Sequence, residues 1–434
     1  MYKKRFGFVH RSVLGVASIA LLAWSAFDTG AAVATPFLAS SSSDCHTAWK
    51  ASQIYTRGNV ASFNGINYRA NWWTQGQSPA SNSGVDSGQP WTAVGACTGT
   101  GGASGTGTGT GTAPVFLYSP YKDATISMDW NTNVISSNVT GQMSPVLSVL
   151  PAGVRALSLA FATGECGSEN WAGVDGGALA AANIQRFTAA NVNYVISTGG
   201  AAGIFTCSSD SGMAAFINRY ASNNLIGIDF DIEAGQTQQV INDLVQRVVV
   251  AQRNYPNLRF SFTLATLAPS QAGATTAGSW GASAPDSFNI YGDWVMQAIQ
   301  TYGLKNYTIN LMTMDYGSAG AGNCVVAGGV CQMGQSAIQA AMNLHDHWGV
   351  PYSQIELTPM IGGNDVVGET FTPADAHTVA AYAKQNGLAG IHFWSFDRDV
   401  DCPPGAASST CNSIGGVGTL GYSNQFSDDL ASGR

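Results

Sequence analysis

The chain has 434 residues, of which 10% are charged and 52 are glycine, and its formal net charge is −8. This length allows one large domain and one small one. Because no Lys/Arg cluster occurs outside the N-terminal leader, we expect no nucleic acid partner. Few charges and many glycines fit an exported protein with long polar loops better than a cytosolic one.

The N-terminus predicts a secretory signal peptide over residues 1–34. An apolar stretch at 12–27 is followed by Ala32-Val33-Ala34, which suits a small-residue cleavage site. A membrane anchor is the alternative, but the stretch is short and two serines interrupt it. No later segment is long and apolar enough to cross a bilayer. We therefore expect a secreted, extracellular protein without a membrane association after cleavage. The basic residues of the leader are Lys3, Lys4, Arg5 and Arg11.

Residues 44–97 form a small segment that is crowded with aromatic side chains. So short a chain has little core, and burying all of these rings is difficult, although a fully buried set is the alternative. A disulfide between its terminal cysteines would stabilise it. If Trp72 and Trp73 lie on a strand, they face opposite ways, so we expect one in the core and one exposed. Exposed rings stack on the flat faces of pyranose sugars. The aromatic residues are Trp49, Tyr55, Tyr68, Trp72, Trp73 and Trp91.

This segment resembles the chitin-binding modules of carbohydrate-binding families 5 and 12 over its whole length. The resemblance rests on Tyr-Arg-Ala-Asn-Trp-Trp-Thr-Gln-Gly at 68–76, followed by Trp91. It implies a small all-β module that binds crystalline chitin or cellulose. The binding residues it implies are Trp72, Trp73 and Tyr55.

Residues 98–112 contain only Gly, Thr, Ser and Ala. Such a stretch cannot bury apolar area and is expected to be a flexible linker. About 15 residues of this composition span roughly 20 Å on average. The linker separates the small segment from a large one, residues 113–434.

The large segment alternates strand-like and helix-like patterns, which predicts an α/β fold, a TIM (β/α)8 barrel. In that fold the catalytic groups lie at the C-terminal ends of the strands. The expected strands are 115–118, 156–162, 194–197, 225–232, 259–265, 308–314, 355–361 and 390–394. The expected helices include 212–223, 237–254, 293–302, 334–348 and 373–386.

The fourth expected strand carries Asp229, Asp231 and Glu233 at alternate positions. Alternate side chains of a strand share a face, so three carboxyl groups line one side and apolar residues line the other. Like charges this close raise one another's pKa, and a carboxylic acid that stays protonated is what a general acid requires. Taken alone, the segment also fits an exposed edge strand or a calcium site. Its place at the end of a barrel strand favours catalysis.

Eight cysteines in an exported chain indicate disulfide bonds. Sequence does not fix the pairing, but the spacing suggests that neighbours pair. Metal binding is the alternative, but no Cys-x-x-Cys pair occurs. His345 and His347 form a lone pair beside Trp348, which suits a surface helix better than a metal site. The suggested pairs are Cys45–Cys97, Cys166–Cys207, Cys324–Cys331 and Cys402–Cys411.

The large segment resembles glycoside hydrolase family 18, the chitinases, over nearly its full length. The family motif Asp-x-x-Asp-x-Asp-x-Glu matches in its last three acids, and Ile226 replaces the first. By alternation, the side chain at position 226 points away from the barrel interior. Loss of the family's first acid there should therefore affect packing more than chemistry. The family's Ser-x-Gly-Gly matches residues 197–200, a pattern that an ordinary turn also produces. It adds Ser197, Gly199 and Gly200 to the expected substrate site.

The sixth strand departs from the family pattern Met-x-Tyr-Asp-Tyr. Met312, Asp315 and Tyr316 match it, and Met314 replaces the family tyrosine, whose hydroxyl contacts the substrate acetamido group. Tyr316 is only a candidate for that contact. The last strand ends in Trp394, which the resemblance places under the reacting sugar, with a core aromatic as the alternative.

The resemblance implies substrate-assisted hydrolysis of β-1,4 N-acetylglucosamine linkages with retention. Glu233 is the expected acid and base, Asp231 orients the acetamido group, and Asp229 supports the proton balance. No metal or organic cofactor is expected. The short connection 362–389 leaves no room for a large extra domain, so we expect an open groove and endo-type cutting. We also expect a monomer. The alternatives are an endo-β-N-acetylglucosaminidase acting on glycoproteins, a chitin lectin and a lysozyme-like enzyme.

Overall fold

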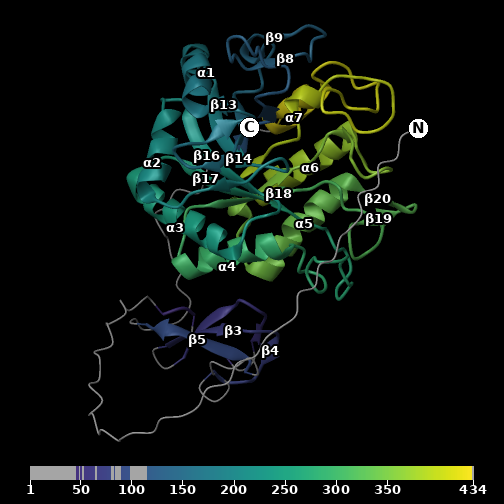
Figure 1. Ribbon diagram of the computed structural model, residues 1–434. Coiled ribbons are helices and arrows are strands. Elements are labelled where there is room, and N and C mark those ends of the chain that lie inside the picture. The colour runs from purple at the N-terminus through teal and green to yellow at the C-terminus, as the bar shows by residue number, and fades with distance from the viewer. Residues whose placement is uncertain are drawn as a thin grey trace, which may run out of the picture.

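The computed structural model describes residues 45–47, 49–50, 53–63, 66–79, 83, 89–97 and 115–432. Within these ranges the chain forms two units, each with its own apolar core (Figure 1). The expected signal peptide and the expected linker lie outside the described residues. Their bounds therefore stay predictions.

The small unit is built from short antiparallel strands. Its three-stranded sheet has the order β2-β3-β5, and a separate pair joins β1 to β4. The core contains Tyr55, Tyr68 and Trp91, and the Cys45–Cys97 disulfide joins its two ends. The strands are β1 (Ile54–Tyr55), β2 (Val60–Phe63), β3 (Ile66–Ala70), β4 (Thr74–Gln75) and β5 (Trp91–Ala96).

The prediction that one of Trp72 and Trp73 is core and the other exposed is wrong. Their side chains are 41% and 58% exposed. Neither lies on a strand, because β3 ends at Ala70 and β4 begins at Thr74. The alternation of a strand therefore does not apply to them. Tyr55 lies in the core instead, with its ring 5.0 Å from that of Trp91.

The large unit is a TIM barrel whose strands all pair in parallel. The sheet has the order β6-β24-β21-β18-β17-β16-β14-β10-β7. Only Ser119 and Pro120 separate β6 from β7, so these two segments act as one first strand, which pairs with the last strand on one side and the second on the other. The strands are β6 (Leu117–Tyr118), β7 (Tyr121–Asp123), β10 (Ala156–Ala162), β14 (Asn193–Gly199), β16 (Leu225–Ile232), β17 (Arg259–Ala265), β18 (Thr308–Met312), β21 (Ile355–Thr358) and β24 (Gly390–Ile391).

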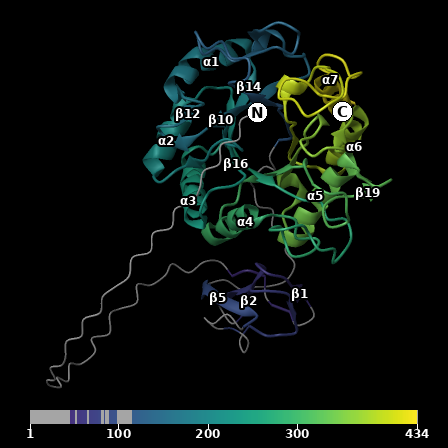
Figure 2. The same cartoon turned by 45° about the vertical axis from the view of Figure 1, so that its right-hand side comes forward.

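Helices surround the barrel (Figures 1 and 2). Five of them confirm the expected helices, while α1 and α7 were not predicted. The connection from β7 to β10, described in full, holds the strand pair β8 (Ser136–Ser137) and β9 (Ser144–Pro145) and a 3-10 turn instead of an α-helix. The helices are α1 (Gly176–Ala190), α2 (Asp210–Arg219), α3 (Gln238–Asn254), α4 (Ile290–Tyr302), α5 (Met333–Trp348), α6 (Pro373–Asn386) and α7 (Gly421–Ala431).

The helix ends follow local sequence signals. Thr372 and Asp375 form a capping box at the start of α6, where each side chain satisfies a backbone N–H. Gly303, Gly349 and Gly387 end α4, α5 and α6 in the left-handed conformation, which costs glycine little. These signals determine the residue at which each of these helices begins or ends.

The two faces of β16 separate apolar from acidic side chains. Ile228, Phe230 and Ile232 are buried in the core, and the Phe230 ring lies 5.4 Å from that of Phe262 on β17. Asp229 and Asp231 occupy the alternate positions and are also buried. The expected alternation along this strand is confirmed.

All four disulfides suggested by the spacing are present. No helix in the described part of the chain is both long and apolar enough to span a bilayer. Among the same residues, no group of three or more His, Cys, Asp or Glu is arranged to hold a metal ion. The Nδ1–H of His345 donates to the carbonyl oxygen of Val350, and its ring stacks on Tyr352, so His345 has a structural contact at the end of α5.

Candidate active site

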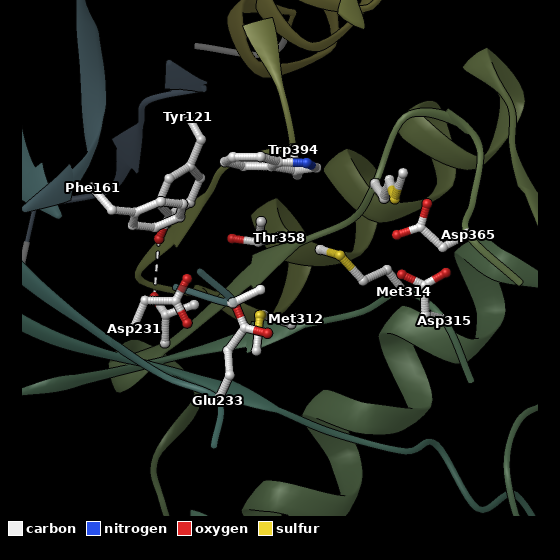
Figure 3. Close-up of a pocket in the computed structure, with 13 residues that line it drawn as sticks. Tyr121, Phe161, Asp231, Glu233, Met312, Met314, Asp315, Thr358, Asp365 and Trp394 are labelled. Atoms are coloured by element: carbon white, nitrogen blue, oxygen red, sulfur yellow. Dashed lines mark hydrogen bonds between the residues drawn. The ribbon is translucent and has the colours of Figure 1, made fainter. Parts of the chain in front are cut away.

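A cavity lies where β16, β18, β21 and β24 end (Figure 3). Four carboxyl groups contribute to its wall, and none of the described residues that line it is Lys, Arg or His. Apart from Thr263 and Thr358, the rest of the wall is apolar or aromatic. Its lining residues are Tyr121, Phe161, Ala201, Asp231, Glu233, Thr263, Met312, Met314, Asp315, Thr358, Met360, Asp365 and Trp394.

Asp229 lies inside the barrel as the first of the three acids, and four hydroxyl groups donate to it. Tyr121 and Ser197 bond its Oδ2 at 2.9 and 2.6 Å. Ser261 and Thr263 bond its Oδ1 at 2.6 and 2.7 Å. These donors come from β7, β14 and β17, so the barrel interior holds this carboxylate from three strands. Hydrogen bonds of this kind stabilise a buried charge.

Asn310 on β18 orients two of those hydroxyl groups. Its Nδ2 donates to the oxygens of Tyr121 and Thr263, at 2.9 Å in each case. Its Oδ1 accepts from Thr358, at 2.7 Å. Because the amide donates to both hydroxyl oxygens, their own hydrogens are left to point toward Asp229. The network fixes Asp229 and leaves it no freedom to turn toward the cavity.

Asp231 is held quite differently. Its side chain is only 4% exposed, yet Oδ1 has no hydrogen-bond partner among the described residues. Burial, followed by the charges of Glu233 and Asp229, raises the pKa of Asp231 well above its ordinary value. A buried carboxyl oxygen without a partner is costly in a finished structure. This oxygen belongs to a residue of the cavity wall, where the donor of a bound ligand can reach it.

Glu233 follows the last residue of β16 and extends into the cavity (Figure 3). Burial raises the pKa of Glu233, the backbone N–H of Ala201 opposes this, and the charge of Asp315 adds to it. Burial is therefore the main cause, as it is for many catalytic acids. A carboxyl group with a raised pKa keeps its proton closer to neutrality and is suited to proton donation.

The Ser-x-Gly-Gly segment lets β14 approach the end of β16 closely. Gly199 has φ 85° and Gly200 has φ 80°. A Cβ on Gly199 would lie 2.1 Å from the carbonyl oxygen of Asp231, and one on Gly200 would lie 2.8 Å from the Phe161 ring. The backbone N–H of Gly200 donates to that same carbonyl, at 3.2 Å. Both glycines are therefore sterically required, and both contact the backbone carbonyl of Asp231 or donate to it.

Trp394 presents its indole ring to the cavity just beyond the end of β24 (Figure 3). It stacks on Phe161, with centroids 5.5 Å apart and planes at 22°, and lies 6.2 Å from the ring of Tyr121. Aromatic neighbours fix the plane of the ring. A flat and rigid apolar surface of this kind suits the C–H face of a sugar.

The sixth strand places Met312, Met314 and Asp315 on the cavity wall. Tyr316 is different, because its ring is 1% exposed and it does not line the cavity. Tyr121 is the one tyrosine among the described lining residues, and its hydroxyl is committed to Asp229 and Thr263. Among the described residues that line the cavity, no tyrosine hydroxyl is thus available to take the place of the hydroxyl that the family tyrosine would supply at position 314.

Sequence reasoning did not find several residues of the site. Tyr121 follows Pro120, beyond the point where the first strand was expected to end. Phe161 lies within an expected strand, but an apolar residue there gives no indication of a binding site. Asp365, an exposed carboxyl on the loop after β22 (Gly362–Gly363), had no motif around it. The lining residues that sequence reasoning missed are Tyr121, Phe161, Ala201, Thr263, Thr358, Met360 and Asp365.

Comparison with known proteins confirms both expected resemblances. Residues 48–92 match the family model of carbohydrate-binding module family 5/12. Endochitinase 11 of Metarhizium anisopliae is 25% identical over 377 residues, which cover 80% of this chain and 63% of that protein. A probable bifunctional chitinase/lysozyme of Escherichia coli (strain K12) is 25% identical over 366 residues, which cover 80% of this chain and 37% of that protein. This chain thus spans less than two thirds of either relative.

Among solved structures, the active domain 2 of a chitinase from Pyrococcus furiosus has a similar fold. The TM-score is 0.54 at 23% sequence identity, and the match covers 73% of this chain and 95% of that domain. At this level of identity the likeness establishes the fold of the barrel.

Proposed function

We propose that the protein is an exported chitinase that cleaves β-1,4 linkages of N-acetylglucosamine within the polymer and retains the anomeric configuration. The observation that supports this best is Asp231 Oδ1, a buried acceptor without a partner beside a carboxyl group with a raised pKa. An acetamido N–H is the donor that such an oxygen lacks. The aromatic floor at Trp394 supports a sugar as the ligand.

In the first step Glu233 donates its proton to the oxygen of the leaving sugar. As the C–O bond breaks, the carbonyl oxygen of the substrate's own acetamido group attacks the anomeric carbon. An oxazolinium ion forms, and its ring replaces the enzyme carboxylate that serves as nucleophile in most retaining glycosidases. The leaving chain departs as an alcohol, and Glu233 becomes a carboxylate.

Asp231 supports this step through position and charge. Its Oδ1 accepts the acetamido N–H, which turns the carbonyl oxygen toward the anomeric carbon. As positive charge develops on the acetamido group, a carboxylate beside it stabilises that charge. Asp229 is fixed by four hydroxyl donors, and its charge contributes to the raised pKa of Asp231.

In the second step Glu233 removes a proton from a water molecule, which attacks the anomeric carbon and opens the oxazolinium ring. Two displacements at the same carbon give net retention. Glu233 is protonated again at the end, so the enzyme returns to its starting state.

The connection after β21 supports endo-type cutting. Between β21 and β24 it contains only β22, β23 (Thr370–Phe371) and α6. No added domain walls the cavity there, which leaves room for a chain that continues on both sides. The two exposed tryptophans of the small unit are proposed to hold the enzyme on insoluble chitin.

Two assays test the proposal together. Purified protein is given colloidal chitin and, separately, an N-linked glycoprotein, and 1H NMR follows the anomer first released from a chito-oligosaccharide. We expect chitin to be cleaved, the β-anomer to appear first, and cello-oligosaccharides, which lack the acetamido group, to remain intact. Release of the α-anomer, or cleavage of cello-oligosaccharides, would overturn the mechanism. Faster cleavage of the glycoprotein would favour an endo-β-N-acetylglucosaminidase.

The Escherichia coli relative supports a second candidate function. Its name includes lysozyme, and peptidoglycan also contains an acetamido group on the sugar at which lysozymes cleave. Purified peptidoglycan, assayed beside chitin at equal mass, separates the two. Comparable rates would make this protein bifunctional, and cleavage of peptidoglycan alone would replace the chitinase proposal.

A further inference from the structure

Asp315 has a backbone conformation that needs support from its surroundings. Its φ is 52°, in the left-handed region that non-glycine residues seldom adopt. Such a conformation persists only where neighbouring contacts determine it, and it is concentrated at functional sites. Asp315 lines the cavity, and its charge contributes to the raised pKa of Glu233. Whatever fixes Asp315 therefore affects the catalytic acid.

The supporting contacts come from one loop, residues 364–369, between β22 and β23. Asn364 Oδ1 accepts the N–H of Asp315 at 3.3 Å. Glu369 Oε2 accepts the N–H of Tyr316 at 3.0 Å. In return, Asp315 Oδ1 accepts the N–H of Val366 at 3.0 Å. Three hydrogen bonds thus bind a loop of the sixth strand to a loop of the seventh.

Hydrogen bonds within the loop of residues 364–369 hold that loop in place. Its residue Asn364 donates to the carbonyls of Met360 and Gly362, at 2.9 and 3.2 Å. The backbone N–H of Asn364 bonds the carbonyl of Glu369, at 3.0 Å, and closes the loop. The Glu369 side chain is 4% exposed and does not line the cavity. Its carboxyl group thus acts on the site through Asp315, by hydrogen bonds to the backbone there and by the repulsion between the two carboxylates.

We propose that Glu369 is a positioning residue that holds Asp315 in its left-handed conformation, and so holds the Asp315 carboxyl beside Glu233. Glu369 does not touch the sugar. Its contribution passes entirely through Asp315, which is why it should vanish when the Asp315 carboxyl is removed. The inference rests on the proposed function for its kinetic test only.

A double-mutant cycle tests this dependence. Glu369→Met keeps the length of the side chain and removes the acceptor, while Glu369→Gln keeps an acceptor oxygen. Asp315→Gly removes the carboxyl group, and glycine adopts the positive φ without strain. The kcat and KM of each variant, and of Asp315→Gly/Glu369→Met, are measured on a soluble chito-oligosaccharide. Thermal unfolding is followed in parallel.

We expect Glu369→Met to lower kcat by about 10- to 100-fold, because a displacement of about 1 Å at a reacting group has a cost of that order. Glu369→Gln should keep kcat within about twofold, since it rescues the hydrogen bond. In the Asp315→Gly background, Glu369→Met should change kcat by less than about twofold. An equal loss in both backgrounds, or an unchanged kcat in Glu369→Met, would overturn the proposal.

Glu169→Met is the matched control for stability. Glu169 is also a buried glutamate that accepts a backbone N–H, from Gly167 at 3.1 Å, but it lies outside the cavity. It should lower the unfolding temperature and leave kcat and KM unchanged. If Glu369→Met does not fold, Asn364→Ala takes its place in the cycle, because it removes the acceptor for the N–H of Asp315.

A crystal structure of the Glu369→Met variant gives a readout without catalysis. We expect Asp315 to leave the left-handed region or its carboxyl to move from the cavity wall. An unmoved Asp315 would refute the clamp whether or not the protein hydrolyses chitin. Conversely, a wild-type protein without activity on chito-oligosaccharides would refute the proposed function and leave this structural test in force.

Discussion

Gly199 packs directly against the backbone of Asp231, so that a Cβ at position 199 would lie 2.1 Å from the Asp231 carbonyl oxygen. Real Cβ atoms do not approach an oxygen this closely. One of the two strands would have to move, and Asp231 would move with it. The contact makes the position of Asp231, the proposed partner of the acetamido group, depend on the absence of a side chain one strand away.

We predict that Gly199→Ala lowers both stability and activity, by about 2–4 kcal/mol in the free energy of unfolding and by at least tenfold in kcat. Gly173→Ala is the matched control. Gly173 also has a positive φ, 94°, but a Cβ there meets nothing within 4 Å. Gly173→Ala should lower the free energy of unfolding only by the cost of a positive φ at alanine, about 1 kcal/mol, and should leave kcat unchanged. Urea unfolding and steady-state kinetics measure both, and equal effects of the two substitutions would contradict the steric explanation.

Glu233→Gln should abolish most of the activity. Glutamine keeps the shape of the side chain but has no proton to donate, and general acid catalysis contributes about 10²- to 10⁴-fold. Chitin binding should be nearly unchanged, and stability should be equal or higher because one of three neighbouring charges is removed. Near wild-type cleavage of chito-oligosaccharides by a folded Gln variant would remove Glu233 from the mechanism and reopen a calcium-binding or structural role for the trio.

The pH dependence of kcat should change when the charge of Asp315 is removed. Glu233 must be protonated to act, so activity falls as pH rises through its pKa. The charge of Asp315 raises the pKa of Glu233. Without that charge the pKa falls, and the protonated form is lost at lower pH. Asp315→Asn should therefore move the alkaline limb of the profile toward lower pH.

Asparagine is a suitable replacement because it tolerates a positive φ and keeps an oxygen for the N–H of Val366. A pH profile of kcat on a soluble substrate, measured with wild type and variant side by side, checks the direction. An alkaline limb that stays in place, or moves upward, would show that Asp315 acts on the substrate and not on the acid.

The sequence predicted those parts of the molecule that depend on local periodicity. Alternation along β16 identified Asp229, Asp231 and Glu233, and spacing identified the four disulfides. Contacts between distant loops were not predictable in this way. Glu369 accepts a hydrogen bond from the backbone N–H of Tyr316, 53 positions away in the chain. No sequence motif around either residue indicates that the two are in contact. Which loops meet is decided by barrel closure, a property of the whole chain.

The small unit illustrates the same limit on a shorter scale. Alternation was applied to Trp72 and Trp73, but the sheet ends at Ala70, and both rings are exposed. A turn placed two residues earlier or later changes the outcome, and strand ends are the least certain feature of a periodic pattern. Tyr55, which the family resemblance placed on the binding surface, packs in the core instead.

Both exposed tryptophans should contribute to chitin binding without supporting the fold. We expect Trp72→Ala and Trp73→Ala each to weaken binding to insoluble chitin severalfold, with unfolding temperatures within a few degrees of wild type. Trp91→Ala is the contrasting variant, since Trp91 is fully buried and its loss should cost about 3–5 kcal/mol. Activity on soluble oligosaccharides should not change in the first two variants. If neither alters chitin binding, these rings are not the binding surface.

Met314→Tyr tests whether the site lacks a hydroxyl group that its chemistry can use. Met314 lines the cavity, Tyr316 does not, and the hydroxyl of Tyr121 is already bonded to Asp229. A new hydroxyl at position 314 therefore competes with no existing donor. A neutral hydrogen bond is worth about 0.5–1.5 kcal/mol, so kcat/KM should rise by roughly two- to tenfold if the hydroxyl meets the acetamido oxygen. Met314→Phe has the same ring without the hydroxyl and should show no gain. Equal rates for the Tyr and Phe variants would mean that the acetamido oxygen needs no donor here, and that Asp231 and the aromatic floor are enough to orient it.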